Sequence, residues 1–154
     1  MNTFELETIL KRNITPQEIF LGVFALDCLP TRSDLRHKNQ WFLVCNCCLS
    51  TQSGHHWIAV FYDHGSIEFF DSFALAPWVY DDRMVKFLHD TSEAYEVIII
   101  SDVRLQEVNS DVCGHYCILF GVARSGGDTF HNIVKGLSTL TRDNLVRFIV
   151  KTIL

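Results

Sequence analysis

The chain has 154 residues and a mass of 17.7 kDa, which is the size of one compact domain and leaves little room for a second core. Hydrophobic residues make up 48% of the chain and charged residues 20%, a balance that excludes global disorder and low complexity. The formal net charge of −5 argues against a basic surface for nucleic acid, so DNA is a doubtful partner. We expect a single domain over residues 1–154.

Cysteine content and hydropathy bear on the environment of the chain. The six cysteines do not require a disulfide framework, because a domain of this size folds without crosslinks and the N-terminal residues lack a secretory signal. The longest apolar stretches, such as residues 19–26, are far shorter than the roughly 18 to 20 residues of a membrane helix. We therefore expect a soluble, intracellular monomer with reduced thiols and no membrane partner.

The first part of the chain predicts one clear helix. Asn2 and Glu5 have the spacing of a capping box at its start. The apolar stripe expected on this helix consists of Phe4, Leu6, Ile9 and Leu10. Pro16 is a second helix-start signal, but Gly22 follows so soon that only a short helical turn is expected there.

The middle of the chain predicts a sheet. Residues 41–49, 56–62 and 67–73 are rich in β-forming residues and are separated by polar turns. The apolar run 97–100 is wholly β-branched, which favours a buried strand over a short helix. These segments predict a hairpin and at least two further strands.

Helical spacing returns after residue 111. The apolar side expected for this helix comprises Val112, Tyr116, Leu119 and Val122 or Ala123. A last helix is expected after the candidate cap Thr141, with a stripe formed by Leu145, Phe148, Ile149 and Ile153. A central, mostly antiparallel sheet flanked by helices, the α+β class, is the fold that these elements support.

The predicted hairpin allows a register argument. A tight turn around His64 and Gly65 would place His56 opposite Phe73. Asp71, two residues earlier on the second strand, is then a diagonal neighbour of His56 on the same face, about 7 to 8 Å away by backbone position. A three-residue loop would break this register.

The same register separates this pair from its rivals. His55 and Glu68, the nearest residues of each type, would point to the opposite face. A histidine beside a carboxylate in apolar surroundings is oriented by it, and its charged form is stabilised. Taken alone, His56 would more often be a surface residue and Asp71 a turn former, so the pairing is what favours a functional site.

Cys113 lies at the predicted start of the helix that follows residue 111. Unpaired amide donors and the helix dipole lower the pKa of a thiol at that position, and a neighbouring imidazolium lowers it further, which yields a nucleophilic thiolate. Gly114 removes side-chain bulk beside the sulfur. Most free cysteines are instead buried, inert thiols, and Cys117, one turn later in the helix, fits that description.

Gln106 lies seven residues before Cys113, in a predicted loop. Acyl transfer requires hydrogen-bond donors aimed at the developing oxyanion, and a glutamine amide together with the backbone N–H of Cys113 forms a suitable pair. By itself, Gln106 would be a solvated loop residue.

The order of these residues resembles a known family. Cysteine proteases of the adenovirus protease (adenain) type, and more distantly the SUMO-deconjugating proteases, have the chain order His, Asp or Glu, Gln, Cys. The matching elements here are His56-Trp57, Asp71, Leu105-Gln106 and Cys113-Gly114. Residues 20–24 with Asp27 and Pro30 are similar to an N-terminal segment of adenain, and residues 105–114 match its Gln-to-Cys spacing. The resemblance covers most of the chain.

This resemblance implies a papain-like cysteine protease core with a circularly permuted catalytic order. It also implies a role for each matching residue: Cys113 as nucleophile, His56 as base and acid, Asp71 as the residue that orients His56, and Gln106 as oxyanion donor. Trp57 matches the tryptophan beside the family's cleft, where with Gly114 it would bind substrate. The narrow passage there favours glycine next to the scissile bond, which implies an endopeptidase for Gly-containing sites in precursor proteins.

An origin and partners follow from the same resemblance. The expected source is a DNA virus or virus-like mobile element, with viral precursor polypeptides cleaved during virion maturation, in the host nucleus or the virion. No cofactor or metal is implied as required. Activation by a peptide stays open, but not through the disulfide of the best-known members, because their cysteine eleven residues before the glutamine is Tyr95 here.

Two alternatives stay open. A deconjugating isopeptidase for SUMO or another ubiquitin-like protein would use the same catalytic residues, and Asp71 is the choice of that branch where adenain has Glu. The chain lacks an obvious extra surface for such a modifier, so this alternative ranks second. A non-catalytic zinc module would use Cys45, Cys47, Cys48, His55 and His56, although no paired Cys-x-x-Cys knuckle is present.

Overall fold

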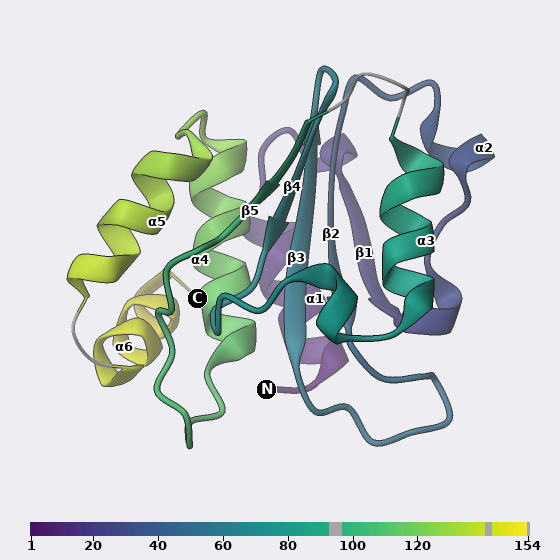
Figure 1. Cartoon of the computed structure of the whole chain (residues 1–154). Helices are drawn as coiled ribbons and strands as arrows, with labels where there is room; N and C mark the ends of the chain where they lie inside the picture. Colours follow the sequence, from purple (N-terminus) through teal and green to yellow (C-terminus); the bar gives the residue numbers. More distant parts are fainter. Residues whose placement is uncertain (93–96, 141–142, 154) are drawn as a thin grey trace.

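The computed structural model describes residues 1–92, 97–140 and 143–153 (Figure 1). The strands are β1 (Phe20–Ala25), β2 (Gln40–Asn46), β3 (Trp57–Asp63), β4 (Ser66–Phe70) and β5 (Val97–Ile100). The α-helices are α1 (Thr3–Asn13), α2 (Arg32–Leu35), α3 (Asp82–Thr91), α4 (Cys113–Ser125), α5 (Phe130–Thr139) and α6 (Asp143–Ile153). Short 3-10 helices are η1 (Gln17–Ile19), η2 (Leu26–Cys28) and η3 (Pro77–Val79).

The five strands form one mixed sheet in the order β1-β2-β3-β4-β5. The three central strands are antiparallel, as the sequence predicts, whereas β1 pairs parallel with β2 and β5 parallel with β4. Parallel neighbours need long crossover connections, and α3 lies in the connection between β4 and β5. The expected α+β class is confirmed.

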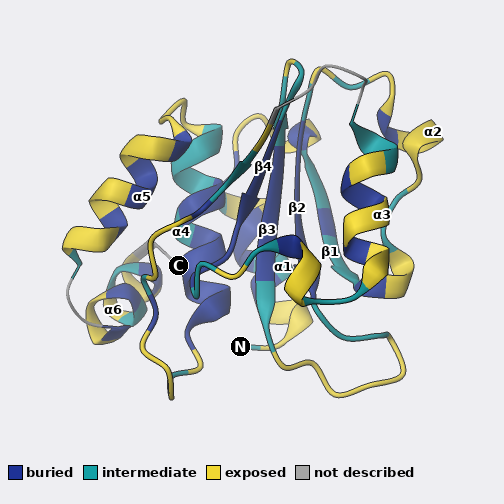
Figure 2. Cartoon of the chain, in the orientation of Figure 1, coloured by how far each residue is buried: buried dark blue, intermediate teal, exposed yellow. Residues whose placement is uncertain are grey.

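Both faces of the sheet are covered, because side chains alternate between them along each strand. On one face, α1, α4, α5 and α6 cover a core that includes the side chains of Phe42, Val44, Ala59, Phe61 and Phe70. On the other face, α2 and α3 cover a core that includes Leu43, Cys45, Ile58, Val60, Ile67 and Phe69. Figure 2 shows the central strands buried and the exposed residues gathered on the outward sides of the helices.

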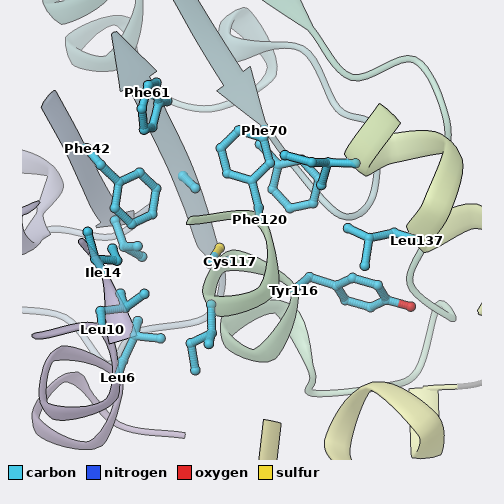
Figure 3. Close-up of a cluster of buried hydrophobic side chains, with 14 of the residues drawn as sticks. Leu6, Leu10, Ile14, Phe42, Phe61, Phe70, Tyr116, Cys117, Phe120 and Leu137 are labelled. Atoms are coloured by element: carbon cyan, nitrogen blue, oxygen red, sulfur yellow. The ribbon is translucent and has the colours of Figure 1, made fainter. Parts of the chain in front are cut away.

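An aromatic cluster fixes α4 against the sheet (Figure 3). The rings of Phe70 and Phe120 stack with centroids 4.5 Å apart, and Phe42 lies within 6.4 Å of Phe120 and 6.1 Å of Phe61. Such pairs contribute about 0.5–1.5 kcal/mol each beyond the burial of their area. The position of α4 along the strands is therefore set by large, fully buried side chains.

The β3–β4 hairpin has the predicted register. Its two-residue turn consists of His64 and Gly65, with φ values of 45° and 95°, as a type I′ turn requires. The pairing of Ala59 with Phe70 and of Asp63 with Ser66 follows from that turn. Continued past Ala59, this register brings residue 56 toward residues 71 and 73.

The face of the hairpin that packs on α4 carries a separate ion-pair network. Arg124 donates to Glu68 at 2.8 Å and to Asp63 at 2.9 Å, and its guanidinium lies 4.5 Å from the ring of Phe61. Glu68 thus points away from Asp71, as the alternation predicts. The network connects the C-terminal end of α4 to both strands of the hairpin.

Two predicted apolar stripes differ in part from the observed ones. In α1 the capping box and the burial of Leu6, Ile9 and Leu10 are confirmed, but Phe4 is 79% exposed, because it lies two residues before Leu6 and so on the other side of the helix. In α6 the buried apolar residues are Val146 and Val150. The predicted Leu145 and Phe148 are 42% and 66% exposed, whereas the predicted Ile149 is half-buried, so the observed stripe is centred one residue later than the predicted one. The predicted cap Thr141 and the side chain of Ile153 lie outside the described residues.

Three strands or longer helices were not predicted, and neither were the short helices α2, η2 and η3. β1 is a strand interrupted by Gly22, which has a φ of 139° and coincides with a register shift against β2. The other two are the helices α3 and α5. Their buried residues have the spacing i, i+3, i+4 of an amphipathic helix, so the signal is present in the sequence: Met84, Phe87 and Leu88 in α3, and Phe130, Ile133, Val134 and Leu137 in α5.

No helix among the described residues is long and apolar enough to cross a bilayer.

We predict that Gly121→Ala lowers the free energy of unfolding by about 1–2 kcal/mol, because a methyl group in this close contact overpacks the core. A Cβ on Gly121 would lie 2.5 Å from two atoms of the Phe42 ring, which is itself fully buried. Chemical denaturation measures the change.

The matched control is Gly136→Ala in α5, where a Cβ meets nothing within 4 Å. Higher helix propensity should stabilise that variant by about 0.5–1 kcal/mol. Equal effects of the two substitutions would contradict the close packing of α4 on β2.

Candidate active site

The predicted site residues meet at the edge of the sheet where β3 begins and β4 ends. The N-terminus of α4 and the loops before β3 and α4 converge there around a cavity of about 250 Å³. Its lining includes His56, Trp57, Gln106 and Cys113, together with Met1, Gly54, His55, Phe73, Ser110 and Asp111. Asp71 lies behind His56 and is almost fully buried.

Asp71 anchors the site through four hydrogen bonds. Its Oδ1 accepts from Nε2 of His56 at 2.7 Å and from the backbone N–H of Phe73 at 2.9 Å. Its Oδ2 accepts from the hydroxyl of Tyr80 at 2.5 Å and from the backbone N–H of Leu75 at 3.2 Å. Burial alone would raise the pKa of Asp71, but its interactions with His56 and these other donors hold the pKa below its usual value.

His56 is held in one orientation. Its ring lies between those of Phe73 and Tyr80, with centroid distances of 4.9 and 6.1 Å. Because Nε2 is bonded to Asp71, Nδ1 is the nitrogen available to a thiol. Burial alone would lower the pKa of His56, but hydrogen bonds and charge interactions with Asp71 and Cys113 outweigh it and raise the pKa to about 9.

Cys113 is the first residue of α4, where helix amides have no partner within the helix. Burial alone would raise the pKa of its thiol. The hydrogen bond with His56 and backbone hydrogen bonds from Trp57 and Gly114 more than compensate, so the pKa is lowered. A lowered thiol pKa beside a raised imidazole pKa favours the thiolate–imidazolium pair.

The amide of Gln106 is fixed at both ends. The hydroxyl of Ser72 donates to Oε1 at 2.7 Å, and Nε2 donates to the backbone carbonyl of Ser110 at 2.7 Å. One N–H of the amide is left without a partner among the described residues, on a side chain that lines the same cavity as Cys113. The site can therefore offer two donors, this N–H and the backbone of Cys113, to a substrate oxygen.

Trp57 lines the cavity, and Gly114 is buried against its indole. A Cβ on Gly114 would lie 3.2 Å from Cδ1 of Trp57 and 3.3 Å from the sulfur of Met1, so no larger side chain fits there without displacement. The indole N–H of Trp57 donates to the carbonyl of Met1 at 3.4 Å. A second cavity of about 470 Å³ shares Met1, Gly54 and Trp57 with the first, which extends the cleft toward β1 and β2.

The structure thus places His56, Asp71, Gln106 and Cys113 together, with Trp57 at the same cavity and Gly114 buried behind it. Sequence reasoning missed two residues that hold them, Ser72 and Tyr80. The proximity of Phe73 to His56 follows from the hairpin register, whereas no local pattern indicates Tyr80, because the loop after β4 returns it to Asp71. Tyr95 lies outside the described residues.

The described residues contain no group of three or more His, Cys, Asp or Glu side chains that could hold a metal ion. Cys45 is buried and directs its thiol to the carbonyl of Asn46 at 3.1 Å. Burial also raises the pKa of the thiols of Cys45 and Cys47, which disfavours the thiolate form that zinc requires. The zinc-module alternative has no support from this geometry.

We predict that iodoacetamide at neutral pH alkylates Cys113 before the other five cysteines, because a lowered pKa increases its thiolate fraction. His56→Ala should slow this reaction about tenfold or more, since each pKa unit changes the thiolate fraction about tenfold. Peptide mapping by mass spectrometry measures both. His55→Ala, which removes the neighbouring imidazole, is the control and should leave the rate unchanged. Prior labelling of a different cysteine would argue against an activated thiol.

Comparisons with known proteins bear on the fold. No family model and no curated protein matches the chain. Among solved structures, the chain is similar to the crystal structure of the ASFV pS273R protease, with a TM-score of 0.53 and 19% sequence identity over 87% of this chain. The chain spans 61% of the length of that protease. The two share an α+β fold in which helices flank a central sheet.

Proposed function

We propose that this protein is a cysteine peptidase in which Cys113, His56 and Asp71 form the catalytic triad. The observation that carries the proposal is the buried His56–Asp71 hydrogen bond of 2.7 Å beside a thiol of lowered pKa at a helix N-terminus. Similarity to the fold of a protease supports the same activity. The chain order of these residues also resembles that of adenain-type and SUMO-deconjugating proteases.

The first half-reaction is acyl transfer to sulfur. The Cys113 thiolate attacks the carbonyl carbon of the scissile bond, a C–S bond forms, and the carbonyl electron pair moves to oxygen. The free N–H of Gln106 and the backbone N–H of Cys113 stabilise that oxyanion. The His56 imidazolium then gives its proton to the leaving nitrogen as the C–N bond breaks, which leaves a thioester and a free amine.

The second half-reaction releases the acid. Neutral His56 removes a proton from water, whose oxygen attacks the thioester carbonyl, and the same two donors stabilise the oxyanion. The C–S bond breaks and the electron pair returns to Cys113. The products are a carboxylic acid and the regenerated thiolate–imidazolium pair. Asp71 keeps His56 oriented in both steps and stabilises the imidazolium whenever it forms, without losing its own negative charge.

We infer that the substrates are proteins with glycine beside the scissile bond. The resemblance to adenain-type proteases supports this inference, and Trp57, which matches the tryptophan beside that family's cleft, lines the same cavity as Cys113. The second cavity, which shares Met1, Gly54 and Trp57 with the first, has the size to take further residues of an extended peptide. We propose an endopeptidase that processes viral precursor polypeptides during virion maturation, in the host nucleus or the virion.

The proposed chemistry needs neither metal nor cofactor, because the thiolate, the proton carrier and the oxyanion donors all come from this chain. We propose that it acts as a monomer. Any activating peptide would bind without a disulfide through Tyr95. The negative net charge makes DNA an improbable activator.

We predict that Cys113→Ala abolishes peptide cleavage while the fold is retained, because no other group replaces the nucleophile. His56→Ala should lower kcat at least about 10²-fold, since it removes the proton carrier. His55→Ala is the matched control, an adjacent imidazole without the bond to Asp71, and should have a mild effect. A fluorogenic library of glycine-containing peptides measures all three.

Activity that persists in Cys113→Ala would refute the assignment of Cys113 as the nucleophile. A larger effect of His55→Ala than of His56→Ala would refute the assignment of His56 as the base. A parallel assay with SUMO conjugates distinguishes the two enzyme classes. Cleavage of conjugates but not of precursor peptides would favour a deconjugating isopeptidase with the same catalytic residues.

We predict a bell-shaped pH dependence of kcat/KM. Activity needs the thiolate, which exists above the lowered pKa of Cys113, and the imidazolium, which exists below the His56 pKa of about 9. The alkaline limb should therefore lie near pH 9. Asp71→Asn removes the charge that stabilises the imidazolium, so it should move that limb to lower pH. Asp90→Asn, on the exposed side of α3, should leave it in place; a shift as large as that of Asp71→Asn would contradict the assignment.

A further inference from the structure

Ser72 connects the two halves of the site. It follows Asp71 directly in the chain and is 1% exposed. Its hydroxyl donates to Oε1 of Gln106 at 2.7 Å, and its backbone carbonyl accepts from the N–H groups of Leu105 and Gln106 at 2.9 and 3.0 Å. One residue beside the carboxylate that orients His56 therefore holds the loop that carries the oxyanion donor.

The local backbone explains why Asp71 and Ser72 can serve different partners. The carbonyl of Asp71 accepts from the N–H of Ala74 at 2.9 Å, and its Oδ1 accepts from that of Phe73, so the chain turns sharply after β4. Ala74 completes the turn with a φ of 58°. Within this turn the Asp71 side chain contacts His56, while the adjacent Ser72 side chain contacts Gln106.

The hydrogen bonds also decide which end of the Gln106 amide is nitrogen. The carbonyl of Ser110 only accepts, so the atom that faces it must be Nε2. The hydroxyl of Ser72 then faces Oε1 as a donor. A rotated amide would place its acceptor against the Ser110 carbonyl and direct an oxygen, instead of an N–H, at the developing oxyanion.

We propose that Ser72 is a positioning residue that fixes the Gln106 amide with its free N–H directed at the oxyanion. This inference rests on the proposed peptidase activity and adds a residue that does not itself touch substrate. Without the Ser72 hydroxyl, Oε1 of a side chain that is only 2% exposed loses its partner. The Ser110 contact alone then holds the amide, and the donor is less well aligned when the oxyanion forms.

The test compares Ser72→Ala with Ser101→Ala. Ser101 is also buried, at 2% exposure, but its hydroxyl donates to the carbonyl of Val103 and not to Gln106. Ser72→Ala should lower kcat about tenfold with little change in KM, part of the roughly 10²–10³-fold loss expected for Gln106→Ala. The double variant Ser72→Ala/Gln106→Ala should be no slower than Gln106→Ala, because Ser72 acts through that amide. Alkylation of Cys113, which forms no oxyanion, should keep its wild-type rate in Ser72→Ala.

Ser72→Cys fills nearly the same space with a weak donor and is the second variant if the alanine variant folds poorly; its kcat should fall between wild type and Ser72→Ala. Unchanged kcat in Ser72→Ala, or additive losses in the double variant, would overturn the inference while the peptidase proposal stands.

NMR of the ¹⁵N-labelled protein gives a readout that needs no substrate. The side-chain amide of Gln106 should be rigid in wild type and in Ser101→Ala, and mobile in Ser72→Ala. A rigid amide in Ser72→Ala would also overturn the inference, even if the protein cleaves no peptide. If the wild-type protein cleaves no peptide but the Gln106 amide is mobile in Ser72→Ala, the peptidase proposal is refuted and the positioning role of Ser72 is supported.

Discussion

The site depends on a buried carboxylate that keeps its charge. Asp71 is removed from water, which by itself favours the protonated acid, yet four donors surround its two oxygens and hold it ionised. Tyr80 is one of them, and burial beside this carboxylate raises its pKa, so its hydroxyl stays a donor. The negative charge in turn favours protonated His56, and the protonated imidazole lowers the pKa of the Cys113 thiol. Each charge therefore depends on the one before it.

Three separate features of the fold bring the residues of the site together. The hairpin register delivers His56 and Asp71 side by side. Aromatic packing of Phe120 against the sheet sets where α4 begins, and thus where Cys113 lies. The turn after β4 carries Ser72 to Gln106. No single feature positions the whole site, because the site residues are spread over residues 56–113 and become neighbours only when the sheet is complete.

Local chemistry explains what the sequence could predict. The turn residues His64 and Gly65 set the hairpin register by themselves, and the start of α4 at Cys113 follows from its apolar spacing. Features that depend on distant packing were missed or misplaced. The apolar spacing predicts Leu145 and Phe148 on the buried side of α6, but burial of Val146 instead of Leu145 is decided by how the helix packs on α4. Tyr80 and Ser72 gain their partners from loops whose paths no local pattern encodes.

The ion pairs of Arg124 have a mechanical consequence for chemistry at the opposite end of the same helix. Arg124 is attached to Asp63 and Glu68 eleven residues beyond Cys113, about 16 Å along the axis at 1.5 Å per residue. These contacts with both strands of the hairpin oppose sliding and tilting of α4 on the sheet. A tilt of only about 4° displaces the sulfur by about 1 Å, enough to cost about 10²-fold in a reaction that depends on near-attack geometry. A guanidinium far from any substrate thus helps to keep the nucleophile aligned.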